Sequence, residues 1–86
     1  MEYDAALKNR LKRIEGQVRS VLRMMEEEKE CSEIVTQMSA ARNALDRVIG
    51  LVVSANLEYC IRNQVKGNGG TDELIEEAVN LLVKSR

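Results

Sequence analysis

The chain of 86 residues contains no histidine, phenylalanine, tryptophan or proline. Without Phe or Trp, and with only two tyrosines, its core has to be built from Leu, Ile, Val, Ala and Met. Proline is absent, glycine occurs only five times, and Ala, Leu, Glu, Lys and Arg are abundant. This composition favours helix nearly everywhere. We therefore predict an all-α fold that forms a single helical domain over residues 1–86.

Long apolar runs are also lacking. No segment approaches the roughly 20 residues that span a bilayer, and the acidic start of the chain, residues 1–4, has no apolar signal region. We therefore expect a cytoplasmic protein with no membrane contact. In a reducing compartment, Cys31 and Cys60 are more typical of reactive or ligand-binding thiols than of a permanent disulfide.

Enzyme signatures are absent as well. The sequence has no histidine to act as a general base, no nucleophile elbow and no glycine loop of the kind that cradles phosphate after a strand. The paired acidic residues are better explained as solvated helix faces. We expect neither catalysis nor a cofactor.

Apolar residues at steps of three and four predict three helices. The first covers residues 4–27 with Asp4 as its N-cap. The second is long and central, over about residues 32–65, and its apolar seam alternates three and four in the manner of a coiled coil. The glycine-rich segment 66–70 ends this helix, and the third begins at the N-cap Thr71. The seam of the central helix consists of Cys31, Ile34, Met38, Ala41, Leu45, Val48, Val52, Ala55 and Tyr59.

The net charge of −1 conceals an asymmetry. Residues 1–25 hold six basic and three acidic side chains, whereas the rest of the chain has an acidic excess of four. A basic excess confined to one helix is expected of an anion-binding surface, although a solvated helix face is the alternative. The six basic residues are Lys8, Arg10, Lys12, Arg13, Arg19 and Arg23.

The two cysteines lie near opposite ends of the predicted central helix. At about 1.5 Å per residue they are roughly 43 Å apart, whereas a disulfide needs Cα atoms within roughly 4.4–6.8 Å. If two copies of the helix pack antiparallel and cross midway, near Leu45 and Asp46, Cys31 of one copy faces Cys60 of the other. Two-fold symmetry then repeats the pairing at the other end. Two buried and inert thiols are the alternative.

Asn56 precedes Cys60 by one helical turn. A histidine in that place would form a pair of metal ligands with Cys60, but an amide is a poor ligand for soft or borderline cations. We therefore predict no metal site of the usual kind. Two thiolates remain sufficient for Cu(I), so copper binding stays open.

The segment Asn9–Val18, with the sequence NRLKRIEGQV, resembles the N-terminal signature of the CsoR/RcnR family of copper- and nickel-sensing repressors. Cys31, the stretch 37–40 and the pair Asn56 and Cys60 fit the same pattern. The resemblance implies a three-helix protomer with a long central helix, an antiparallel helical dimer and a dimer-of-dimers tetramer. It also implies a transcriptional repressor that binds operator double-stranded DNA through basic surfaces.

Asn56 takes the place of the family's metal-binding histidine, as in the CstR-like branch, which senses sulfane sulfur. The resemblance therefore implies that Cys31 and Cys60 are sulfur-reactive. Low-molecular-weight persulfides and polysulfides would be the inducers, and a di-, tri- or tetrasulfide between protomers would release the operator and derepress sulfide-detoxification genes. A Cu(I)-responsive repressor that uses the two thiolates is the alternative. Glu76 corresponds to a glutamate linked to allostery in the metal sensors. The DNA-binding residues implied are Arg10, Arg47, Arg13, Lys8 and Lys12.

Overall fold

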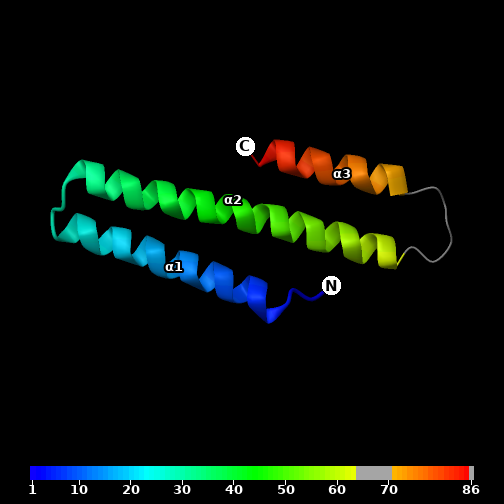
Figure 1. Ribbon diagram of the computed structural model, residues 1–86, viewed down its shortest axis with the longest axis horizontal. Helices are drawn as coiled ribbons and strands as arrows, with labels where there is room; N and C mark the ends of the chain where they lie inside the picture. The colour runs from blue at the N-terminus through cyan, green and yellow to red at the C-terminus, as the bar shows by residue number, and fades with distance from the viewer. Residues whose placement is uncertain (64–70, 86) are drawn as a thin grey trace. The chain divides into compact units, whose positions relative to one another are not determined.

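The computed structural model describes residues 1–63 and 71–85, which contain helices and no strand. The helices are α1 (Ala5–Glu26), α2 (Cys31–Arg62) and α3 (Thr71–Lys84) (Figure 1). The predicted all-α class and its long central helix are confirmed. The glycine-rich break predicted at 66–70 lies outside the described residues, as does the end predicted for the central helix.

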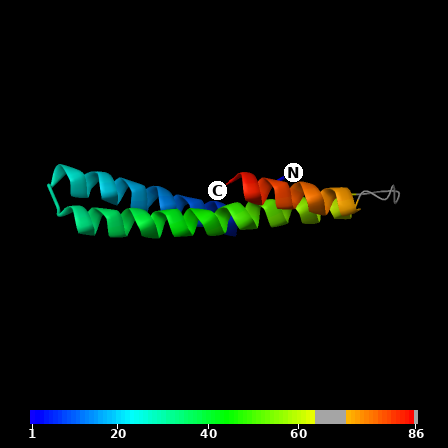
Figure 2. The ribbon, with the colours of Figure 1, turned by 90° about the horizontal axis from the view of Figure 1, so that it is seen from above.

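Two compact units share the long helix α2. One spans Asp4–Val48 and contains α1 with the first part of α2, and the two helices run antiparallel side by side (Figures 1 and 2). The other contains the part of α2 from Ile49 onward together with α3, which lies alongside it, and the first three residues of the chain. The unit Asp4–Val48 holds Cys31 together with the residues predicted to bind DNA, and the other unit holds Cys60.

Helix α1 starts where the sequence predicts. The side chain of Asp4 accepts a hydrogen bond of 2.8 Å from the backbone N–H of Leu7, and the backbone of Asp4 is extended. This is the geometry of an N-cap, in which a carboxylate satisfies one of the donors that the first helical turn leaves unpaired.

Helix α1 ends in a Schellman turn made without glycine. The N–H of Lys29 donates to the carbonyl of Met24 at 3.0 Å, and the N–H of Glu28 donates to the carbonyl of Met25 at 3.1 Å. Glu28 has a φ of 55°, in the left-handed region that glycine usually occupies at this position. The turn therefore reverses the chain from α1 into α2 at the cost of a strained glutamate.

The buried core of one chain is small. Within the described residues, the buried apolar side chains are Ile14, Val21, Ala41, Val48 and Ala78. Along the seam of α2, Met38 is 49% exposed and Leu45 is 42% exposed. The seam is thus only partly covered inside one chain, as expected when a short polypeptide completes its core by association. None of the described helices is both long and apolar enough to cross a membrane.

Candidate functional sites

Cys31 is the first residue of α2. The carbonyl of Glu30 accepts from the N–H groups of Glu33 at 3.0 Å and Ile34 at 3.1 Å, which starts the helix at this cysteine. Cys31 is exposed and not in a disulfide. Its sulfur therefore lies at the positive end of the helix macrodipole, within reach of small solutes.

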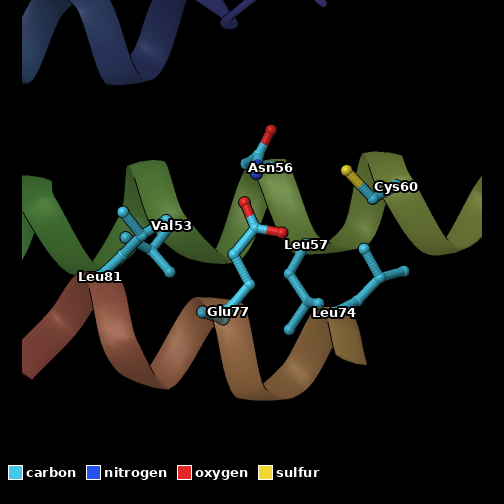
Figure 3. A pocket seen from close by; sticks show the side chains of 8 residues that line it. Val53, Asn56, Leu57, Cys60, Leu74, Glu77 and Leu81 are labelled. Atoms are coloured by element: carbon cyan, nitrogen blue, oxygen red, sulfur yellow. The ribbon is translucent and has the colours of Figure 1, made fainter. Parts of the chain in front are cut away.

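Cys60 lies in the other unit, in a small pocket between α2 and α3 (Figure 3). The pocket has a volume of about 10 Å³, which is close to the space of one water molecule. Cys60 and Asn56 are both partly buried, and both line it. The remaining lining residues are Val53, Leu57, Leu74, Glu77, Ala78 and Leu81.

Glu77 is the acidic residue of α3 that lines this pocket. It extends its carboxylate toward α2 on the side of Asn56 (Figure 3). Glu76, which the family resemblance links to allostery, is not among the lining residues, and its role stays a prediction. The spacing explains the difference, because Leu74, Glu77 and Leu81 lie at i, i+3 and i+7 on one face of α3. The sequence contained this signal in the apolar stripe of the third helix.

Within one chain, the donor atoms around Cys60 do not make the usual copper or nickel site. They comprise one thiol, the amide of Asn56 and the carboxylate of Glu77, whereas soft and borderline cations prefer sulfur and imidazole nitrogen. Over residues 1–63 and 71–85, no three Cys, Asp or Glu side chains are grouped so that they could hold a metal ion. Asn56 is therefore a departure in chemistry as well as in sequence.

The residues predicted to bind DNA all lie in the unit formed by Asp4–Val48, and all are exposed. Because α1 and α2 are antiparallel and joined by a short turn, Arg10 and Arg47 lie at about the same height along the helix pair. Lys12 and Arg13 lie on the side of α1 opposite its apolar stripe. Lys8 and Arg10 lie on the two flanks of α1, between the apolar stripe and the side that carries Lys12 and Arg13.

Residues 3–84 match the family model described as metal-sensitive transcriptional repressor. The chain belongs to this family. It is 41% identical over 70 residues to the copper-sensing transcriptional repressor RicR of Mycobacterium tuberculosis (strain ATCC 25618 / H37Rv), covering 80% of this chain and 73% of RicR. It is 34% identical over 76 residues to the copper-sensing transcriptional repressor CsoR of Bacillus subtilis (strain 168), covering 88% and 74%.

The chain is also similar to YrkD of Bacillus subtilis (strain 168), an uncharacterized protein, with 56% identity over 63 residues that cover 73% of this chain and all of YrkD. Among solved structures, the nickel-responsive transcriptional regulator InrS matches with a TM-score of 0.75 and 35% identity, over 96% of this chain and 92% of InrS. The protein is therefore a transcriptional repressor of the CsoR fold, which agrees with the expectation that it is not an enzyme. The family resemblance is confirmed, and the sensing branch stays a prediction.

Proposed function

We propose that this repressor senses sulfane sulfur through Cys31 and Cys60, and that the reaction releases operator DNA. One observation carries the proposal: the residue one turn before Cys60, which lines the same pocket, is an asparagine. The thiol needed for sulfur chemistry is present, and the imidazole needed for the usual metal chemistry is replaced by a poor ligand. The proposal assigns the protein to the reducing cytoplasm, where both thiols stay free until an inducer arrives.

The proposal requires a second copy of the chain. Both thiols belong to α2, so an uninterrupted helix excludes a bond between them within one protomer. An apolar hollow of about 270 Å³ lies between α1 and α2, beside Met38 and Leu45. An antiparallel partner helix would fill this hollow and cover the seam, and two such dimers would make the tetramer.

The sulfur chemistry uses two displacements. The thiolate of Cys31 attacks a sulfane sulfur of a polysulfide, an S–S bond breaks, and a shorter polysulfide leaves while Cys31 becomes a persulfide. The thiolate of Cys60 from the second copy then attacks the sulfur bonded to Cys31, which expels HS⁻ and leaves a disulfide. If Cys60 is itself persulfidated first, the same displacement leaves a trisulfide, and one further sulfane sulfur gives a tetrasulfide. The two thiols are oxidised and the sulfane sulfur is reduced to sulfide.

The cross-link acts on DNA binding by fixing one arrangement of two protomers. In the reduced state, Arg10, Arg47 and their basic neighbours contact operator phosphates, so affinity falls steeply as salt rises. If the cross-linked arrangement moves these cations apart, coupling of about 1–3 kcal/mol lowers the affinity by about 5- to 150-fold.

Intact mass spectrometry under denaturing, non-reducing conditions tests the proposal. After polysulfide treatment, we expect covalent dimers heavier than two chains by whole sulfur atoms, or lighter by the hydrogens lost to a disulfide. The Cys31→Ala and Cys60→Ala variants should each remain monomeric in this assay, and DNA binding of the wild type should weaken in parallel. Persulfides confined to single chains, with DNA affinity unchanged, would contradict the proposal.

A Cu(I)-responsive repressor is the second candidate, because the relatives RicR and CsoR are copper-sensing. It would use the two thiolates without the missing imidazole. Titration of the reduced protein with Cu(I) against a competing chelator separates the candidates. Tight Cu(I) binding that weakens DNA affinity, with polysulfide inert, would favour copper sensing.

A further inference from the structure

Gly16 is an exposed glycine in the interior of α1. A Cβ atom built at this position meets nothing within 4 Å, so the fold of the chain itself does not require a glycine here. Glycine in a helix interior costs stability relative to alanine because it loses more backbone entropy. No contact within the chain explains the glycine at position 16, so we look for its cause in a binding partner.

The orientation of α1 shows where Gly16 points. Ile14 and Val21 are buried, and the side-chain oxygen of Gln17 is also buried. At about 100° per residue, Gly16 lies on the opposite side of the helix from Ile14 and Val21. The residues within roughly 60° of Gly16 form what we call the outward face of α1. They are Ala5, Asn9, Lys12, Arg13, Arg19, Ser20 and Arg23, all of them exposed.

The outward face carries four cations and no acid between residues 9 and 23. Glu15 lies at its edge and pairs with Arg19 at 3.5 Å, but both side chains are about two-thirds exposed, so the pair leaves the arginine available to another anion. Lys12 and Arg13 precede Gly16, and Arg19 and Arg23 follow it. At Gly16, no side chain projects from the centre of this cationic helix face.

We propose that the outward face of α1 is a seat for a DNA phosphate backbone, and that Gly16 is the point of closest approach. This inference rests on the DNA-binding part of the function proposed above, and of the residues named there only Lys12 and Arg13 belong to this face. With no side chain at the centre, a phosphate strand can lie close to the helix, and the flanking cations reach it from both sides. Arg and Lys contacts to phosphate position a protein on the duplex and make its affinity depend on salt. The charge favours nucleic acid over the α1 face of a second copy, which would present the same cations.

The substitution Gly16→Ala tests the proposal without harming the fold. Because the added methyl group has open space and alanine is the better helix former, we expect a higher thermal midpoint. We expect binding to a fluorescein-labelled 30-base-pair duplex of mixed sequence, followed by anisotropy at low salt, to weaken by about tenfold, the loss expected for one charge-assisted hydrogen bond. The slope of log affinity against log salt should become shallower by about one. Gly16→Leu should weaken binding further.

Gly50→Ala is the matched control, because a Cβ at Gly50 in α2 also meets nothing within 4 Å. It should leave DNA affinity and salt slope unchanged. Equal affinity of Gly16→Ala and wild type, or equal losses in both alanine variants, would overturn the inference. So would a change of oligomer mass in Gly16→Ala by light scattering, because it would show that a second copy packs there.

The same measurements separate this inference from the sulfur-sensing proposal. If Gly16→Ala weakens DNA binding and polysulfide does not affect it, the phosphate seat is supported and the sulfur-sensing proposal is contradicted. If polysulfide abolishes DNA binding and Gly16→Ala does not change it, sulfur sensing is supported and the phosphate seat is contradicted. A wild-type protein that binds no duplex at low salt would overturn the phosphate seat.

Discussion

Asn56 occupies the position one helical turn before Cys60, and its side chain lines the same pocket. An amide and an imidazole are similar in size, but they differ in their affinity for soft and borderline cations. In the proposed function, this one side chain decides the inducer class more than any other feature of the pocket does.

The substitution Asn56→His should convert the site toward metal binding. A histidine and Cys60 at i and i+4 face the same side of α2, and Cys31 of a second copy would supply a further thiolate. We expect Asn56→His to bind Cu(I) at least about tenfold more tightly than the wild type, a gain of about 1.4 kcal/mol. Competition with a chromogenic Cu(I) chelator measures this gain.

Asn56→Gln is the control, because it keeps an amide at the site and should not gain affinity. A wild type that binds Cu(I) as tightly as Asn56→His would show that Asn56 does not set the choice of inducer.

The helices follow from the sequence because their causes are local. The spacing of apolar residues predicted all three, and the cap at Asp4 was correctly placed. The place of Glu77 in the Cys60 pocket also follows from spacing, because it lies on one face of α3 with Leu74 and Leu81. One feature was not predictable in this way. The first helix ends close to the expected residue 27, but no glycine marks the left-handed backbone of Glu28. This conformation is set by how α1 and α2 meet, which local propensity does not encode.

The connection between α1 and α2 offers a direct test of helix-end strain. Glu28 has a φ of 55°, where a residue with a Cβ costs about 1–2 kcal/mol. Glu28→Gly removes this cost but adds backbone freedom to the unfolded chain, so we expect the free energy of unfolding to rise by about 1 kcal/mol. Urea unfolding followed by circular dichroism measures the change.

Glu27→Gly provides the comparison, because Glu27 has a φ of −85° and carries no such strain. It should lower the stability or leave it unchanged. A decrease in stability for Glu28→Gly would mean that the glutamate side chain stabilises the turn by more than its backbone costs.

At the scale of the whole molecule, the partly exposed seam of α2 is the observation that supports the proposed dimer. Met38 and Leu45 border the apolar hollow beside α1, and each is slightly less than half exposed. In the proposed antiparallel dimer, the helices cross near Leu45, which makes this leucine the centre of the interface. Pairing of Cys31 with Cys60 of the second copy depends on that crossing point.

Leu45→Glu tests the crossing point, because a residue on a two-fold axis meets its own copy. The substitution removes two apolar side chains from the interface and replaces them with like charges, at a cost of about 3 kcal/mol or more. We expect the dimer to dissociate at protein concentrations about a hundredfold higher than for the wild type, as measured by analytical ultracentrifugation. Asn43→Glu adds the same charge at an exposed position on another face of α2 and should leave association unchanged. Because the two thiols meet only in the dimer, Leu45→Glu should also lose the polysulfide cross-link while both cysteines remain present. A cross-linked Leu45→Glu dimer would place the crossing of the two α2 helices elsewhere.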